Sequence, residues 1–175
     1  MLLPVRSESL HTAHLVLSPF SPDDAERAMD MLTDQAIGRT YMLPEFPCRE
    51  ASRPLFERLF RLSQNRDRFI YSIRLQDELI GWINETENAF PVIEVGYVIH
   101  PSFQNQGYAT EALQAAIHEL FGMGYTRIRA GFFAGNTPSQ RVMEKSGMQP
   151  TGETVEIPYR NALHTCILFE IQKPS

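Results

Sequence analysis

The spacing of apolar residues changes once in the middle of the chain, and that change restricts the possible folds. From Val92 to Ile99 apolar residues alternate with other types, whereas from Gly107 to Phe121 they recur every three or four residues. The first spacing is typical of a strand and the second of a helix, and Arg127 to Phe133 is again strand-like. A strand, a helix and a strand in this order predict a right-handed crossover and one parallel pair of strands.

The rest of the chain predicts antiparallel strands and further helices. Alternation and turn residues indicate strands at His14 to Ser18, Phe69 to Leu75, Leu79 to Asn84 and Leu163 to Ile171, with a tight turn at Gln76 to Glu78. Helices are indicated from Pro22 to Thr33 after a Ser21 cap, around Leu55 to Leu62, and from Asn136 to Ser146 before Gly147. We therefore expect an α/β chain of the mixed α+β kind, with helices on both faces of the sheet.

Composition and charge fit one catalytic or binding domain over residues 1–175. The apolar share of 43% is ordinary for a globular chain, and the net charge of −5 gives no basic surface for nucleic acid. The arginines between 58 and 68 are interrupted by acidic residues, which is typical of a solvated helix face. No nucleic-acid partner is expected.

The two cysteines, Cys48 and Cys166, lie far apart and match neither a metal motif nor a disulfide framework. His164 shares a predicted strand face with Cys166, but no third ligand has suitable spacing. The opening Met1 to Val5 is too short for a signal-peptide core, and no apolar run has the length of a membrane span. We expect a cytoplasmic setting, no metal and no membrane partner.

Six residues between the central strand and its helix, Gln104-Asn-Gln-Gly-Tyr-Ala109, suit a phosphate-binding loop. A helix N-terminus offers unpaired backbone N–H groups and a partial positive charge. Gly107 removes the Cβ that would hold a pyrophosphate away from the backbone, and Ala109 is small. The loop lacks the Gly-Lys-Ser/Thr of nucleoside triphosphate sites and two of the three glycines of dinucleotide sites, so both ligand classes are disfavoured.

Several motifs in one order resemble the GNAT superfamily of N-acetyltransferases over nearly the whole chain. The pyrophosphate loop of that superfamily runs Gln/Arg-x-x-Gly-x-Gly/Ala, which Gln104, Gly107 and Ala109 match. Further segments resemble the RimJ/RimL-type branch, which acetylates N-terminal amines of ribosomal proteins: His14-Leu-Val-Leu, Gly81-Trp-Ile, Glu94-Val-Gly-Tyr97, Gly107-Tyr-Ala-Thr-Glu-Ala, Asn136-Thr-Pro-Ser139 and Glu144-Lys-Ser-Gly-Met148. The resemblance implies a mostly antiparallel sheet of about six to seven strands, splayed at its parallel pair, and about four helices.

The resemblance also implies acetyl-coenzyme A (acetyl-CoA) as the cosubstrate. Backbone groups of Val98 and Ile99 would bind the pantetheine arm as an added peptide strand would. Loop N–H groups would bind the pyrophosphate. The implied cofactor-binding set is Val98, Ile99, Gln104, Asn105, Gln106, Gly107, Tyr108, Ala109, Thr110, Asn136 and Ser139.

Acetyl transfer requires a neutral amine, and Glu94 is the candidate general base. By resemblance, the acetyl end of the cofactor lies beside the strand that carries Glu94. Alternation places Glu94 on the face of Gly96 and Val98, so that a glycine lies next to the carboxylate. The alternative is a solvated glutamate on an exposed strand face. If Glu94 acts, we expect a bridging water.

Transfer also requires stabilisation of the departing thiolate, for which Ser139 is the candidate. Many members of the superfamily place a tyrosine four residues after an Asn-x-x-Ala pattern, but the equivalent residue here is Met143, which has no proton to give. By resemblance, Ser139 lies near the cofactor sulfur and donates a hydrogen bond to it, while Asn136 holds the pantetheine arm. Both residue types are also ordinary helix caps.

The acceptor wall, by resemblance, comprises the first two helices and the connection from Gln35 to Arg49. Its possible lining residues are Tyr41, Met42 and Phe46, which equally suit a role in capping the core. Trp82 either lines the same cleft or packs beneath it. A protein or peptide N-terminal α-amine is the expected acceptor.

Two other functions stay open on the sequence. One is acetylation of a small amine such as a polyamine, an amino acid or an antibiotic. The net negative charge of the chain is compatible with such a cationic acceptor. The other is a non-catalytic acetyl-CoA sensor, for which Met143 is the only hint and against which Glu94 and Ser139 argue. The protein is expected to be a monomer or a homodimer.

Overall fold

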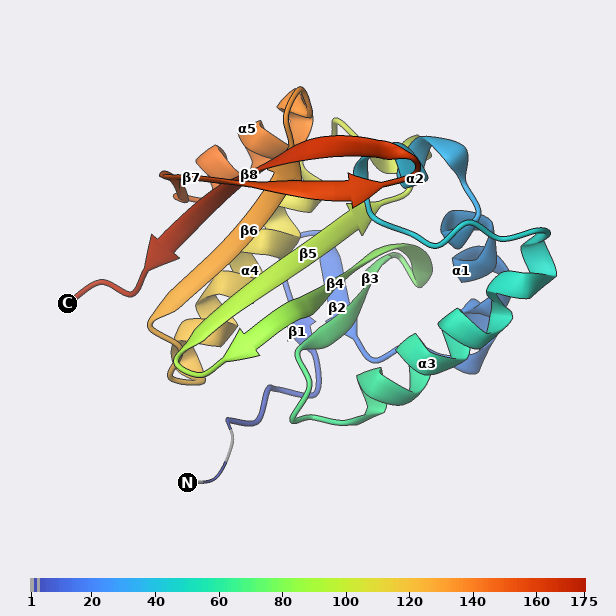
Figure 1. The fold of residues 1–175 in the computed structure, drawn as a ribbon. Coiled ribbons are helices and arrows are strands. Elements are labelled where there is room, and N and C mark those ends of the chain that lie inside the picture. The colour runs from blue at the N-terminus through green and yellow to red at the C-terminus, as the bar shows by residue number, and fades with distance from the viewer. Residues whose placement is uncertain (1, 3) are drawn as a thin grey trace.

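A computed structural model describes residue 2 and residues 4–175 of the chain. One sheet of eight strands runs through the described part in the order β1-β2-β3-β4-β5-β6-β8-β7 (Figure 1). The strands are β1 (Leu10–His11), β2 (Leu15–Ser18), β3 (Ile70–Leu75), β4 (Glu78–Ala89), β5 (Val92–Ile99), β6 (Arg127–Phe133), β7 (Gln149–Tyr159) and β8 (Ala162–Gln172).

Within residues 4–175, five α-helices cover the two faces of this sheet. They are α1 (Ala25–Leu32), α2 (Gln35–Thr40), α3 (Arg53–Gln64), α4 (Tyr108–Gly122) and α5 (Thr137–Lys145). Helices α1, α2 and α3 lie on one side of the sheet, and α4 and α5 lie on the other (Figure 1). The mixed α/β class with helices on both faces is thus confirmed.

Pairing within the sheet follows the predicted pattern. Strands β1 to β5 pair antiparallel in succession, and β5 pairs parallel with β6 across the connection through α4. Strand β8 then returns antiparallel beside β6, with β7 outside it. The mostly antiparallel sheet with one parallel pair is confirmed, and its parallel pair lies near the centre.

Element counts from the sequence were too low. Three elements were not predicted: the two-residue β1, the helix α2 and the edge strand β7. Strand β7 carries Pro150 and Gly152 and is mostly exposed, so it lacks an apolar alternation. Helix α2 is only six residues long and contains Gly38, so it shows no apolar stripe. Strand β4 extends to Ala89 through polar residues, beyond the predicted end at Asn84.

Two apolar clusters hold the layers together. On the α4 face, Val95 of β5 and Leu113 of α4 belong to the larger cluster. On the opposite face, Trp82 of β4 packs with residues of α1 and α3. Burying a large aliphatic side chain contributes about 1.5–3 kcal/mol, so these clusters fix β5 rigidly between two layers. The strand that leads into the predicted phosphate loop therefore has a well-defined position.

Candidate active site

The central feature of the site is the separation of β5 from β6. Their parallel pairing involves only three residues of β5, Val92 to Glu94. On its other edge β5 stays paired with β4 as far as Ile99, and β6 stays paired with β8 as far as Phe133. Each strand is therefore held by its outer neighbour while the inner edges diverge, which leaves backbone groups of both strands unpaired across the gap.

Two hydrogen bonds identify which residues of β5 direct their backbone toward this gap. The Pro91 carbonyl accepts from Thr126 N at 2.9 Å on the β6 side, whereas His100 N donates to Ile80 O at 2.7 Å on the β4 side. Because backbone groups alternate along a strand, Tyr97 and Ile99 point to the gap. Val98 instead pairs with β4. Of the two residues predicted to bind pantetheine through the backbone, Ile99 is suitably oriented and Val98 is not.

The loop after β5 leads directly into the N-terminus of α4. Gly107 precedes the helix at φ +86°, a conformation that favours glycine, and Asn105 is also left-handed at φ +60°. No side chain caps the helix, so its first backbone N–H groups stay available. Gln104 Nε2 donates to Ile99 O at 2.9 Å and ties the loop to the strand end. Backbone conformation alone therefore favours glycine at position 107.

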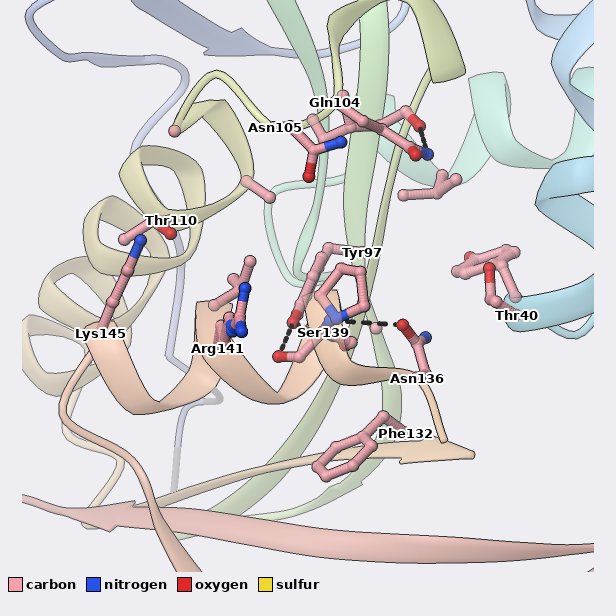
Figure 2. Close-up of a pocket in the computed structure, with 18 of the residues that line it drawn as sticks. Thr40, Tyr97, Gln104, Asn105, Thr110, Phe132, Asn136, Ser139, Arg141 and Lys145 are labelled. Carbon is pink, nitrogen blue, oxygen red and sulfur yellow. Dashed lines mark hydrogen bonds between the residues drawn. The ribbon is translucent and has the colours of Figure 1, made fainter. Parts of the chain in front are cut away.

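A cavity of about 490 Å³ fills the space between the diverging strands and this helix end. In Figure 2, Gln104 and Asn105 lie at one end, Arg141 and Lys145 lie at one side, and Thr40 of α2 lies at the other. The predicted residues that line the cavity are Tyr41, Val98, Ile99, Gln104, Asn105, Gly107, Ala109, Thr110, Asn136 and Ser139. A single cavity thus brings together most of the predicted site.

Two loop residues of the predicted set direct their side chains elsewhere. Gln106 Nε2 donates to Ser102 O at 3.3 Å, and the Tyr108 ring packs edge-on against His14 with centroids 6.3 Å apart. Neither residue lines the cavity. Any part they take in ligand binding must come from their backbone N–H groups.

Ser139 lies in the first turn of α5 and is held from two sides (Figure 2). The Asn136 side chain accepts from Ser139 N at 3.3 Å, so Asn136 is the helix cap that its residue type allows. The Tyr97 hydroxyl lies 3.0 Å from Ser139 Oγ. Burial raises the pKa of Tyr97 to about 12, so its phenol stays protonated at neutral pH. A polar pair thus faces the cavity from β5 and α5.

Glu94 lies near the closed end of the gap and does not line the cavity. Its side chain accepts a hydrogen bond from Thr86 Oγ1 at 3.2 Å, and the residue is half-buried. Burial, and secondarily the charge of Glu94, raises the pKa of the Cys166 thiol. Glu94 therefore shares a sheet face with Cys166 and can act on a cavity ligand only across an intervening distance.

Four residues were possible on the acceptor side, and of these only Tyr41 lines the cavity, while Met42 is 52% exposed outside it. Trp82 is 0% exposed and donates from Nε1 to the Tyr41 hydroxyl at 3.1 Å, so it packs beneath the cavity wall. The Tyr41 hydroxyl donates in turn to Asn84 Oδ1 at 2.9 Å. Phe46 is half-buried outside the cavity. Trp82 thus takes the second of its two expected placements, beneath the cleft, and Phe46 does not line the cavity.

Among the lining residues that the sequence did not predict, three carry polar or charged groups of chemical interest: Tyr97, Arg141 and Lys145. Tyr97 alternates with core residues and so was assigned to the core face, while Arg141 and Lys145 are exposed cations on a helix. Among the described residues neither cation has an ion-pair partner. Their spacing of four residues on α5 places them on one helix face, so this face carries positive charge beside the cavity.

Met143, at the position where many GNAT members have a tyrosine, is buried in the core cluster. It offers no proton to the cavity.

Within the described residues, no group of three metal-ligating side chains comes together, and no helix is long and apolar enough to cross a membrane.

The splayed parallel pair beside an uncapped helix N-terminus is the architecture that the resemblance to the GNAT superfamily implies. The family model of the acetyltransferase (GNAT) domain matches residues 14–149 of this chain. The chain therefore belongs to the GNAT family of N-acetyltransferases, as its motifs predicted, and acetyl-CoA is the acetyl donor of that family.

Relatives and solved structures agree with this assignment. The uncharacterised N-acetyltransferase YnaD of Bacillus subtilis is 32% identical over 81% of this chain and 82% of its own length. Another from B. subtilis, YoaA, is 27% identical over 94% and 97% of the two chains. A GNAT-family acetyltransferase structure from Bacillus anthracis has a TM-score of 0.80 at 27% identity, covering 94% of this chain and 98% of its own.

The ribosomal L7/L12 α-N-protein acetyltransferase RimL, solved with coenzyme A, has the same fold. Its TM-score is 0.82 at 18% identity, and the match covers 94% of this chain and 98% of RimL. The likeness to the RimJ/RimL-type branch is thus found at the level of the fold.

Proposed function

We propose that this enzyme transfers the acetyl group of acetyl-CoA to the N-terminal α-amine of a protein or peptide. The observation that carries the proposal is the gap between β5 and β6, which opens onto one cavity lined by Gly107, Ser139 and Tyr41. Phosphate-binding, sulfur-binding and acceptor-side groups therefore surround the same space.

The cofactor fits this cavity in one direction. The pyrophosphate binds the free N–H groups at the start of α4, where the helix dipole also favours negative charge. The pantetheine arm lies along the unpaired edge of β5, at Tyr97 and Ile99, as an added strand would. Arg141 and Lys145 supply positive charge beside the phosphate groups. The thioester then lies near Ser139 and the acceptor enters from the side of Tyr41.

An α-amine acceptor suits this site because the candidate base, Glu94, lies outside the cavity. At pH 7 an α-amine of pKa about 7.7–8.0 is neutral in roughly a tenth of molecules, whereas a lysine amine of pKa about 10.4 is neutral in about one of 2,500. Glu94 lies outside the cavity and is engaged by Thr86, so it acts through a water molecule. Such a relay is sufficient for an amine that is already partly neutral.

Gly96 provides the path between Glu94 and the cavity. It lies two residues beyond Glu94 on the same strand face and itself lines the cavity, where a side chain would approach Thr86 and Tyr41. The absence of a side chain leaves room for the amine and the bridging water. Glu94 thus removes the proton that the amine loses when its bond to the acetyl carbon forms.

The choice of acceptor draws support from the RimL fold, because RimL is an α-N-protein acetyltransferase. The same fold also serves the microcin C7 self-immunity acetyltransferase MccE, with a TM-score of 0.79 at 18% identity, so fold alone leaves a small amine as the competing acceptor. The acceptor must therefore be identified by reaction.

The deciding experiment measures thiol release from acetyl-CoA with two panels of acceptors, beside direct calorimetric binding of coenzyme A. One panel contains short peptides with free N-termini and matched N-terminally blocked peptides that carry a lysine. The other contains polyamines, amino acids and aminoglycosides. We expect release with the free N-termini only. Release with small amines alone would assign a metabolic or detoxifying activity, and binding without any release would indicate a sensor.

The role of Glu94 is tested by its pH profile. Glu94→Gln should lower kcat/KM at pH 6–7, where most of the amine is protonated, and should recover toward wild type above pH 9. Thr86→Val removes only the hydrogen bond to Glu94 and should have a smaller effect. Full activity of Glu94→Gln at every pH would show that solvent alone deprotonates the amine.

A further inference from the structure

Ser139 differs from the buried or partly buried helix serines elsewhere in the chain. Ser63 and Ser146 each donate from Oγ to a carbonyl three or four residues earlier, at 2.7 and 2.8 Å. This backward bond is the usual choice of a serine within a helix. Within the described residues Ser139 makes no such bond, and its hydroxyl lies instead 3.0 Å from the Tyr97 hydroxyl. The proton of Ser139 is therefore not committed to its own helix.

The Tyr97 hydroxyl has one proton and two acceptors within reach, both on the same residue. Ser139 Oγ lies at 3.0 Å and Ser139 O at 3.3 Å. The shorter contact favours donation to Oγ. A serine hydroxyl that accepts a hydrogen bond at its oxygen still has its own proton to donate. Because Ser139 lines the cavity, that proton is directed into the space where the thioester sulfur lies in the proposed complex.

We propose that Tyr97 is a positioning residue for the acetyl-transfer step: by donating to Ser139 Oγ, it turns the Ser139 proton toward the cofactor sulfur. The inference rests on the proposed function of the site, and specifically on Ser139 facing the sulfur. It assigns a function to a tyrosine of β5 at a site where the α5 position Met143 has no proton to give.

The acidity of the two groups favours Tyr97 as the residue that orients Ser139 over Tyr97 as the proton donor. Burial raises the pKa of Tyr97 to about 12. A free thiol has a pKa of about 8.5, so moving the Tyr97 proton to the thiolate would be unfavourable by a factor of about 3,000. The phenol therefore keeps its proton throughout the reaction, and Ser139 contributes a hydrogen bond in place of a transferred proton.

The bonds balance without a proton from either residue. The acceptor nitrogen forms its bond to the acetyl carbon, and the carbon–sulfur bond breaks with its electron pair moving to sulfur. The thiolate accepts a hydrogen bond from Ser139 Oγ while it leaves. The proton that the nitrogen gives up reaches solvent through Glu94, and solvent protonates the sulfur. Tyr97 and Ser139 thus return to their starting state after each turnover.

The first test needs no acceptor. The ultraviolet absorbance of the thiolate is followed against pH in protein saturated with coenzyme A, with the titration of cofactor-free protein subtracted. We expect Tyr97→Phe and Ser139→Ala each to raise the pKa of the bound thiol, by about one pKa unit for Ser139→Ala. Arg141 and Lys145 line the cavity in every variant, so the comparison isolates the hydroxyl pair.

The second test is a double-mutant cycle in kcat, with Tyr97→Phe, Ser139→Ala and the double variant. Tyr97→Phe should lower kcat about five- to tenfold with little change in KM for acetyl-CoA, and should cost nothing further in the Ser139→Ala background. Tyr125→Phe is the matched control, because the buried Tyr125 hydroxyl bonds Asn88 at 2.9 Å outside this cavity. That variant should lose some stability and no activity.

The outcomes separate this inference from the proposed function. Thiol pKa values that shift as expected, without acetylation of any peptide, would uphold the role of Tyr97 and reject the peptide acceptor. Peptide acetylation with an unchanged thiol pKa and an unchanged kcat in Tyr97→Phe would overturn the inference. Additive losses in the double variant would also overturn it, because they would mean that Tyr97 acts independently of Ser139.

Discussion

The two ends of the parallel pair β5–β6 have opposite structures on the same two strands. At the end of Val92 to Glu94 the strands are hydrogen-bonded, and Ile93 and Ile128 are buried side by side in the core. At the end of Tyr97 to Ile99 the inner edge of β5 is unpaired and faces the cavity. The closed end stabilises the fold, and the open end is where we propose that acetyl-CoA binds.

What separates the two ends is the support each strand receives from its outer neighbour. Strands β4 and β8 hold β5 and β6 beyond the point where these stop pairing with each other. The unsatisfied backbone groups would be costly if buried, and a ligand with amide groups can satisfy them. Substitutions at the two ends should therefore change different quantities.

The largest effect is expected at the closed end. Ile93→Ala removes a core side chain that is 1% exposed and should lower the free energy of unfolding by about 2–4 kcal/mol. Chemical denaturation measures this loss. The kcat and the acetyl-CoA affinity of the folded fraction should stay close to wild type. Weakened cofactor binding without a loss of stability would contradict the division between the two ends.

The next effect is expected at the open end. Ser139→Ala removes a hydrogen bond to a developing thiolate, a charge-assisted interaction worth about 1.5–3 kcal/mol, so kcat should fall roughly ten- to hundredfold. Steady-state kinetics should show little change in KM for acetyl-CoA. Ser146→Ala at the C-cap of the same helix is the control, because the Ser146 hydroxyl donates to Val142 O and its loss should affect stability alone. Equal kcat values for the two variants would exclude the assigned role of Ser139.

A smaller effect is expected at the loop. Gly107→Ala places a side chain at φ +86°, which costs about 1–2 kcal/mol in backbone conformation. Gly152→Ala in β7 is a matched control, since Gly152 lies at φ +82° and also has open space around its Cα. Both variants should lose similar stability, but only Gly107→Ala should weaken coenzyme A binding, about tenfold by calorimetry. Equal affinity of the two variants for coenzyme A would show that the loop around Gly107 does not bind the phosphates.

The smallest effect is expected for the exposed cations. Replacing Arg141 and Lys145 together by glutamine should weaken coenzyme A binding two- to fivefold at low salt, with a reduced dependence on ionic strength, because exposed charges contribute about 0–1 kcal/mol each. Arg58 and Arg61 on α3, replaced in the same way, should leave binding unchanged. An unaltered salt dependence in the first variant would show that its cations do not face the phosphates.

The sequence predicted the strongly patterned elements and missed the polar or irregular ones. Strands β5 and β6 were predicted at their observed bounds, because buried strands beside a long helix show unambiguous periodicity. Strand β7 was not predicted, because its exposed residues, a proline and a glycine among them, show no alternation of apolar and polar types. A strand can therefore be predicted from its sequence when it buries at least one face.

The same limit applies to the site. Gln104, Gly107 and Asn136 were predicted because they match motifs of the GNAT superfamily, and all three line the cavity. Tyr97 was missed because alternation places it with core residues, and only the tertiary contact with α5 reveals its hydroxyl. The two placements of Trp82 stayed open on the sequence, because an aromatic residue in a motif does not indicate which layer it occupies, and the structure places it beneath the cavity wall.

The central claim is that acetyl-CoA completes the unpaired edge of β5, and amide hydrogen exchange tests it most directly. Exchange is measured by nuclear magnetic resonance at single residues of β5, with and without saturating coenzyme A. We predict that the amides of Tyr97 and Ile99 become at least about tenfold more protected, while Val98, which already faces β4, changes little. Unchanged protection at Tyr97 and Ile99, with the ligand shown to be bound, would contradict the claim.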